Sequence, residues 1–469
     1  MVDLLGILIS ALPFAVAAVG LVALGWPAPV AGAASLATAV LGALVWPPLQ
    51  AVAIPGAMLD GLGTSAQVLY VLFGGLLLYN LLSAGDAVDG VSRFLGRLEP
   101  DRVSLAAVVV VGVAPFFESV TGFGVAVVIS APILLAAGFA PLRAAVLATW
   151  GQCAVPWGAL GVGTVIGAHL AGKDFDILSN SSALLILPFF PVYGVAAVAL
   201  ADGWNGVRRR GAEAIALGLV AGVATLLTSI YLLPELSGAV GGLAAAAVFL
   251  AWRRLRLAGV PLRALLPYAF LLALLAATNG VGALRAVLEG LGPLFDGPGL
   301  PLLVSGVFAA VVFGLGGDQI GAATRRTVTQ WFPTAGAVLT FVLAGEVVAG
   351  SGAAGLLAGG AESLGGLFPA VSPVLAALGG ALTGSNAASN ALFMPLQVEA
   401  ARGLDLSPGL TAAVQNVVGS QASMLSPQRL VLAATATGML GHESRILRAA
   451  ITPVAVSIGL LAIVGILLR

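Results

Sequence analysis

The chain alternates long apolar stretches with short polar connections from one end to the other. A membrane helix needs about 17–25 predominantly apolar residues, and many of the stretches reach that length. The longest cover residues 4–25, 66–83, 181–201, 212–233, 262–278, 299–316, 332–350 and 449–468. Shorter or glycine-broken apolar stretches lie between them, so we expect an all-α integral membrane protein with roughly 11 to 14 membrane-spanning helices.

Two segments far apart in the chain resemble each other. One begins TGFGVAVV at Thr121, and the other begins TGSNAASN at Thr383. In both segments an apolar stretch, a Pro, a Gly, a Gln and a second Pro follow in the same order. The difference in residue number between matched positions grows steadily along the chain. The matched pairs are Thr121/Thr383, Pro141/Pro408, Gly151/Gly419, Gln152/Gln421 and Pro156/Pro427. Chance matches compete in a chain with 63 Gly and 26 Pro, but the preserved order favours a duplication. The predicted repeats are residues 1–240, with a core at about 101–172, and 241–469, with a core at about 366–441.

Both segments interrupt an apolar region with glycine and small polar residues. Irregular backbone at membrane depth is tolerated only where it is buried in protein or lines a wet cavity. Paired breaks in duplicated halves indicate a secondary transporter, and a helix that begins at a break offers N–H groups and a positive dipole end to a carboxylate. Small polar residues also join ordinary membrane helices, but their number here favours a binding site. The predicted substrate-binding residues at the breaks are Thr121, Gly122, Gly124, Thr383, Ser385, Asn386, Ser389 and Asn390.

Composition argues against several other classes. Of 469 residues, 59% are hydrophobic and 9% charged, whereas soluble domains have about 25% charged residues. The 20 basic and 20 acidic residues give no basic surface for nucleic acid. One cysteine, Cys153, excludes a disulfide framework. No metal-binding spacing, phosphate loop or pair of nucleophile and base can be identified, so we expect no enzyme, no metal and no other cofactor.

Two basic clusters predict the orientation. Arg208, Arg209 and Arg210 precede the apolar stretch 211–233, and a second cluster follows the stretch 236–252. Two crossings return the chain to the same side, so both clusters are expected in the cytoplasm. The second cluster is Arg253, Arg254, Arg256 and Arg263.

Ionisable side chains inside membrane helices cost at least about 2.5–3.5 kcal/mol and therefore mark functional positions. Glu118 lies one helical turn before the first break, and burial there favours the neutral form that a proton carrier needs. The alternative is a paired carboxylate that fixes two helices. Glu118 is our first choice for the proton-coupling site.

Three further residues are candidates for proton coupling. Asp318 either relays a proton or forms an ion pair with Arg325 and Arg326 at a helix end. Glu346 lies inside the stretch 332–350 with no evident partner. A histidine gains or loses a proton near neutral pH, which makes His169 a candidate for proton coupling. The alternative is that His169 lies at a helix end at the membrane interface.

The second repeat supplies a cation for a carboxylate. Arg429 follows Ser426 and Gln428, and a guanidinium binds a carboxylate at two points; the alternative is an arginine that reaches to the interface. Gln152 and Gln421 are matched hydrogen-bonding candidates. Trp157 either encloses the apolar tail of the substrate or anchors a helix at the interface. The additional predicted substrate-binding residues are Gln152, Trp157, Gln421, Ser426, Gln428 and Arg429.

Three motifs resemble the bacterial L-lactate permease family: ESVTGFG at 118–124, TGSNAASNALFMPLQ at 383–397 and MLSPQ at 424–428. Together with GHES at 441–444, the resemblance spans most of the chain. It implies a proton-coupled symporter of lactate, glycolate or related small 2-hydroxymonocarboxylates in the bacterial inner (plasma) membrane, with inverted repeats, re-entrant helices and a possible homodimer. The chain departs from the family pattern at Asn386, where Asp is common, and at Ser423, where Lys is usual.

Two other transport functions remain open. Unwound Ser, Asn and Gly segments also suit Na⁺, so a sodium-coupled carrier of di- or tricarboxylates is the alternative. An anion channel needs a continuous polar path, and the paired breaks disfavour it.

Overall fold

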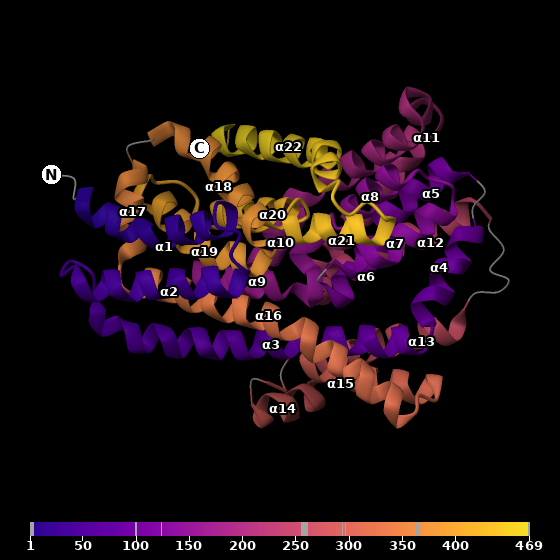
Figure 1. The fold of residues 1–469 in the computed structure, drawn as a ribbon, viewed down its shortest axis with the longest axis horizontal. Helices are drawn as coiled ribbons and strands as arrows, with labels where there is room; N and C mark the ends of the chain where they lie inside the picture. The colour runs from indigo at the N-terminus through magenta and orange to yellow at the C-terminus, as the bar shows by residue number, and fades with distance from the viewer. Residues whose placement is uncertain are drawn as a thin grey trace.

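The computed structural model describes residues 4–98, 101–122, 124–254, 261–292, 294–295, 297–362 and 365–467. Within these ranges the chain is helical and contains no strand, which confirms the all-α prediction. Most of the long helices run nearly parallel to the long axis of the molecule (Figure 1). The protein is a multi-pass membrane protein.

Ten helices of the described ranges are long and apolar enough to cross a membrane, or eleven when one bent pair is included. The spans formed by single labelled helices are α1 (Leu4–Val22), α2 (Ala28–Val45), α11 (Phe189–Tyr231), α13 (Leu262–Gly280), α16 (Gly317–Gly350) and α22 (Glu443–Leu467). The others combine a helix with a shorter turn: η1 (Ala51–Ala53) with α3 (Ile54–Ala84), η4 (Pro234–Leu236) with α12 (Ser237–Trp252), η5 (Gly365–Leu367) with α18 (Phe368–Thr383), and the segments of Arg102–Thr121. The count reaches the lower end of our expected range only with the bent pair.

Several shorter helices complete the described fold. Near the first break and after it lie α4 (Ala87–Leu98), α7 (Val125–Ala136), α8 (Pro141–Trp150), α9 (Gly158–Ala171) and α10 (Phe175–Ile186). The second half contains α14 (Gly282–Leu291), α15 (Gly299–Phe313), α17 (Ala353–Glu362), α19 (Asn386–Gly403), α20 (Pro408–Ser423) and α21 (Pro427–Thr437). The bent pair joins α8 to Val155–Ala171 at 64°.

The helix α11 joins most of the two apolar stretches that we expected as separate spans, 181–201 and 212–233; residues 181–186 belong to α10. Asp202 and Gly203 have non-helical backbone angles inside it. Gly203 has a φ of 60°, a region that glycine adopts without the steric cost of a Cβ. The helix is therefore two segments joined by a kink, and this partly explains the low count of spans.

The segment Arg102–Thr121 is built from α5 (Arg102–Val108), a π-helical turn η2 (Val109–Val113) and α6 (Ala114–Thr121). Pro115 lies in the first turn of α6. Proline has no N–H to donate to the preceding turn, and π-turns inside helices are frequent near functional sites. This irregular helix carries Glu118 toward the first break.

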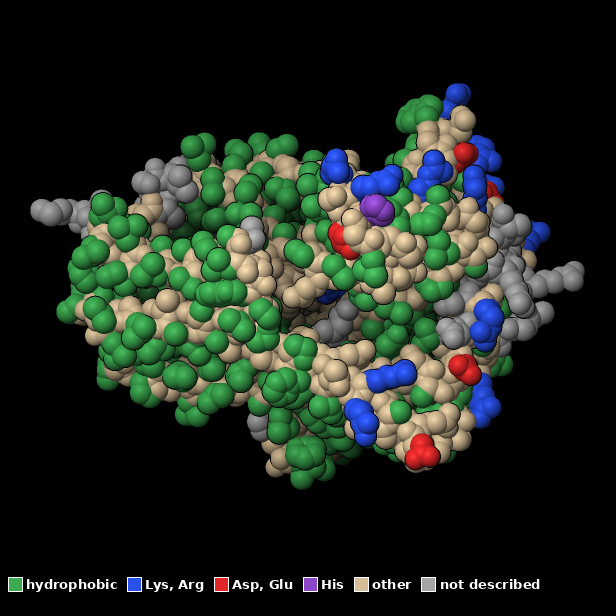
Figure 2. Space-filling model, in the orientation of Figure 1, with side chains coloured by type: hydrophobic (Ala, Val, Ile, Leu, Met, Phe, Trp, Pro, Cys, Tyr) green, Lys and Arg blue, Asp and Glu red, His purple; other side chains and the backbone are tan. Residues whose placement is uncertain are grey.

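The two basic clusters meet at one end of the molecule. Arg210 contacts Asp101 at 2.6 Å, and Arg253 lies 3.7 Å from the same carboxylate and 3.0 Å from Glu213. Burial acts to raise the pKa of Asp101, but hydrogen bonds from Arg210 and Val103 hold it below its ordinary value. Charged side chains gather on the half of the visible face over α11 and α15, away from α1 and α2 (Figure 2). Arg210 and Arg253 therefore lie on one side of the molecule, as we expected for their two clusters, and the cytoplasmic location of this side stays a prediction; Arg256 lies outside the described residues.

Close packing of α18 against α20 depends on Gly380. A Cβ at this position would clash with the carbonyl oxygen of Gly419 and approach the backbone nitrogen of Ser423 to 3.0 Å. We expect Gly380→Ala to destabilise the protein by at least about 1–3 kcal/mol, measured as a lower Tm in detergent. The control is Gly355→Ala in α17, where a Cβ meets nothing within 4 Å. Equal Tm values for the two variants would contradict this packing.

Candidate functional site

Glu118 spans the first helix break. The helix α6 ends at Thr121, and Gly122 and Gly124 have φ values of 72° and 79° before α7 begins. Both residues have backbone angles in a region that glycine favours. The Glu118 carboxylate accepts the N–H of Gly124 at 3.1 Å and 3.2 Å and the N–H of Ala126 at 3.4 Å. The carboxylate thus lies at the positive end of α7, where a negative charge is stabilised.

The second break has a similar arrangement. The helix α18 ends at Thr383, Gly384 follows with a φ of 67°, and α19 begins after Ser385. The Ser385 hydroxyl accepts the N–H of Ala388 at 3.4 Å, and the Thr383 hydroxyl donates to the carbonyl of Gly379 at 2.8 Å. Ser385 is therefore the N-cap of α19.

Arg429 connects the two breaks. It lies in the first turn of α21, whose N-cap is Ser426. Its Nη1 is 2.6 Å from the carboxylate of Glu118 and also donates to Gln152 Oε1, while its Nε donates to the carbonyl of Gly384 at 3.3 Å. Glu118 is fully buried, and Arg429 is 9% exposed. The structure thus brings together three residues that we had predicted separately.

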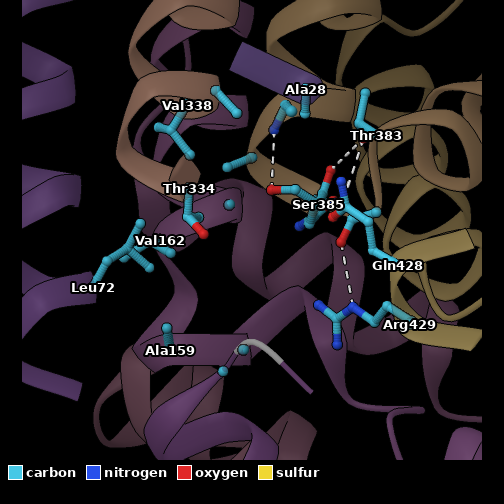
Figure 3. Close-up of a pocket in the computed structure, with 18 of the residues that line it drawn as sticks. Ala28, Leu72, Ala159, Val162, Thr334, Val338, Thr383, Ser385, Gln428 and Arg429 are labelled. Carbon is cyan, nitrogen blue, oxygen red and sulfur yellow. Dashed lines mark hydrogen bonds between the residues drawn. The ribbon is translucent and has the colours of Figure 1, made fainter. Parts of the chain in front are cut away.

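A cavity of about 490 Å³ opens beside this ion pair. Ser385, Gln428 and Arg429 lie on one side of it, and Leu72, Val162 and Val338 lie on the other (Figure 3). Among the described residues that line the cavity, Arg429 is the one basic side chain and Glu118 the one acidic side chain. The predicted residues that line it are Glu118, Gly122, Thr383, Ser385, Asn386, Gln428 and Arg429.

Other predicted residues lie outside the cavity lining. Trp157 is fully buried and donates its indole N–H to Ser179 at 2.9 Å, so it is not at a membrane interface. Gln421 is buried, and neither of its amide atoms has a partner among the described residues. Thr121 donates to the carbonyl of Phe117 at 2.6 Å.

Ser389 and Asn390 belong to a buried amide network next to the cavity. Its centre is Asn416 of α20, whose Oδ1 accepts from Asn386 and from Asn390 at 2.9 Å each. Asn416 Nδ2 donates to Thr164 at 3.0 Å and to Ser182 at 2.9 Å. Gln415 beside it donates to Ser389 at 3.1 Å. Our sequence analysis missed Gln415 and Asn416, although two adjacent amide side chains in an apolar stretch indicate buried hydrogen-bonding groups.

We expect Asn416→Leu to lower the Tm, because a buried polar group that loses its partner costs about 1–3 kcal/mol. The side chains of Asn386 and Thr164 would each lose a bond to Asn416. Asn279→Leu is the control, since Asn279 bonds within its own helix to the carbonyl of Leu275. If Asn416→Leu melted at the same temperature as the parent, the network would have no role in stability.

The remaining ionisable candidates lie elsewhere. His169 Nε2 is 2.9 Å from Glu346 Oε1, so these two predicted residues form a pair between α9 and α16. Asp318 lies exposed in the first turn of α16 and forms no ion pair with Arg325 or Arg326 within the described part of the chain. None of the three lines the cavity.

The chain is similar to known permeases along nearly all its length. A family described as L-lactate permease matches residues 6–257 and 262–469. The L-lactate permease of Streptococcus iniae is 25% identical over 379 residues, which cover 74% of this chain and 80% of that protein. The glycolate permease GlcA and the L-lactate permease of Escherichia coli K12 are each 27% identical over 81% of this chain and 80% of their own length. The matched residues include both helix breaks.

Proposed function

Because this chain belongs to the L-lactate permease family, we propose that it carries L-lactate, glycolate or a related small 2-hydroxymonocarboxylate across the plasma membrane together with a proton. The family is one of transporters, not enzymes. The observation that carries the proposal is the position of Arg429 between the two helix breaks, paired with Glu118 at the edge of the cavity.

The substrate carboxylate binds Arg429 at the polar side of the cavity. The first turn of α19 also lines the cavity, with Ser385, Asn386, Ala387 and Ala388. Ser385 lies on the same side as Arg429 (Figure 3). The first N–H groups of a helix have no partner within the helix and favour an anion. Asn386 Oδ1 has no hydrogen-bond partner among the described residues, so it is suited to accept the 2-hydroxyl of the substrate.

The substrate carboxylate and the carboxylate of Glu118 compete for Arg429, and this competition couples transport to the proton. In the empty site the charges of Arg429 and Glu118 cancel. A bound carboxylate that takes Arg429 leaves the fully buried Glu118 without its cation, and a proton on Glu118 then removes the unpaired buried charge. The loaded site holds Arg429, the substrate anion and neutral Glu118, and again has no net charge. Substrate without a proton leaves a buried negative charge, so the two travel together.

The single basic residue in the cavity lining supports a monocarboxylate rather than the di- or tricarboxylate alternative. A second carboxylate would have no cation among the described lining residues, and an unpaired buried charge is costly. We retain two further proposals from the sequence. One repeat core, at about 101–172 or 366–441, moves relative to the rest of the protein to alternate access, and His169 and Glu346 are further places where protons bind.

Uptake of radiolabelled L-lactate into liposomes tests this function. The purified protein is reconstituted, and an inward proton gradient is imposed in the absence of Na⁺. We expect accumulation that a protonophore abolishes. Uptake that requires Na⁺ at fixed pH would support the sodium-coupled alternative, and ionic currents without accumulation would support a channel.

A further inference from the structure

The cavity is larger than lactate or glycolate requires. Its volume of about 490 Å³ lies within the range of roughly 300–1,000 Å³ that encloses drug-sized ligands. Arg429, which suits a carboxylate, and Asn386, whose Oδ1 suits a hydroxyl, lie on the side formed with Ser385; the polar side chains of Tyr79, Gln330 and Thr334 also belong to the lining. Much of the volume therefore lies beyond the part that a two- or three-carbon acid occupies.

The opposite wall of the cavity is mainly aliphatic, with Thr334 as a polar side chain beside Val162 and Val338 (Figure 3). Leu72 comes from α3, Val162 from α9 and Val338 from α16, and all three face the cavity across from Arg429 (Figure 3). Each is buried, with exposed fractions of 3%, 7% and 1%. Leu76 extends the same wall along α3. A substrate whose carboxylate binds Arg429 would direct the substituent on its C2 toward these side chains.

We propose that the site also accepts 2-hydroxymonocarboxylates with longer aliphatic or aromatic side chains as transported substrates. The proposal rests on the proposed function, because it assumes that a 2-hydroxymonocarboxylate binds at Arg429. Burial of each added methylene against the aliphatic wall lowers the half-saturating concentration by up to about four-fold. A substrate that carries a second carboxylate in place of the apolar group gains no binding free energy from contact with this wall.

Competition and counterflow in liposomes test the proposal. Unlabelled lactate, 2-hydroxybutyrate, 2-hydroxy-4-methylpentanoate and 3-phenyllactate compete with labelled lactate, and 2-hydroxysuccinate is the dicarboxylate control. We expect the inhibition constant to fall along the monocarboxylate series, and each acid loaded inside the vesicles to drive counterflow of labelled lactate. Weaker inhibition with increasing length, or inhibition without counterflow, would overturn the proposal. Absence of any lactate uptake would instead overturn the proposed function.

Variants that narrow the cavity test whether the longer acids bind inside it. Val338→Phe and Leu72→Phe each add volume at this wall, and we expect the ratio of counterflow driven by 3-phenyllactate to counterflow driven by lactate to fall at least ten-fold. The Tm in detergent reports whether each variant is folded. The matched control is Val307→Phe on α15, a position that is 64% exposed. Unchanged selectivity in both wall variants would show that longer acids do not bind in this cavity.

Discussion

Replacing Glu118 by Gln is expected to abolish proton-driven accumulation of lactate while exchange of lactate across the membrane persists. Glutamine has nearly the same shape and retains an oxygen that can accept the N–H of Gly124 and a hydrogen bond from Arg429, both of which Glu118 accepts. It cannot gain or lose the proton that couples substrate to the gradient. The ratio of internal to external lactate should fall to about one.

Two assays on the same liposomes separate coupling from transport. Uptake under an inward proton gradient measures coupling, and counterflow of labelled lactate into lactate-loaded vesicles measures movement of the loaded carrier. Glu399→Gln in α19 is the control, because Glu399 pairs at the surface with Arg402 at 2.8 Å. Uphill uptake that survives in Glu118→Gln at the parent level would remove Glu118 from the coupling mechanism.

The sequence predicted the two breaks because glycine and small polar residues are conspicuous in an apolar chain. It also identified Glu118, since an ionisable side chain inside a membrane helix marks a functional position, and Arg429, since it follows Ser426 and Gln428 at the second-repeat break. Their pairing was not visible, because residues so far apart in the chain meet only through tertiary packing. The same holds for Glu346, which lacked an evident partner in the sequence and pairs with His169 in the structure.

The far wall of the cavity could not be predicted at all. Leu72, Val162 and Val338 are aliphatic residues in aliphatic helices, and nothing in their local sequence separates a cavity-facing side chain from a core or lipid-facing one. The turn at Ala159 and Leu160 was equally hidden. Both have positive φ values, 50° and 57°, in a region that residues other than glycine adopt infrequently, so the surrounding packing imposes this conformation.

Replacing Arg429 by Gln is expected to lower the efficiency of lactate uptake by at least about 30-fold, because truncating one partner of a buried charge pair costs about 2–5 kcal/mol. The loss has two sources. The substrate carboxylate loses its cation, and Glu118 remains buried with only backbone N–H groups as partners. The second source also destabilises the fold, so Tm in detergent is measured beside lactate uptake.

A double variant distinguishes the two sources. Glu118→Gln with Arg429→Gln removes both charges, and we expect it to recover most of the Tm lost in Arg429→Gln because no unpaired buried charge remains. Counterflow of lactate should stay as low as in Arg429→Gln, since neither variant has a cation on the cavity wall. Arg445→Gln is the control, because Arg445 is exposed at the start of α22. Recovery of counterflow in the double variant would show that Arg429 serves to neutralise Glu118 and that the substrate carboxylate binds elsewhere, which leaves the N-terminus of α19 as its binding site.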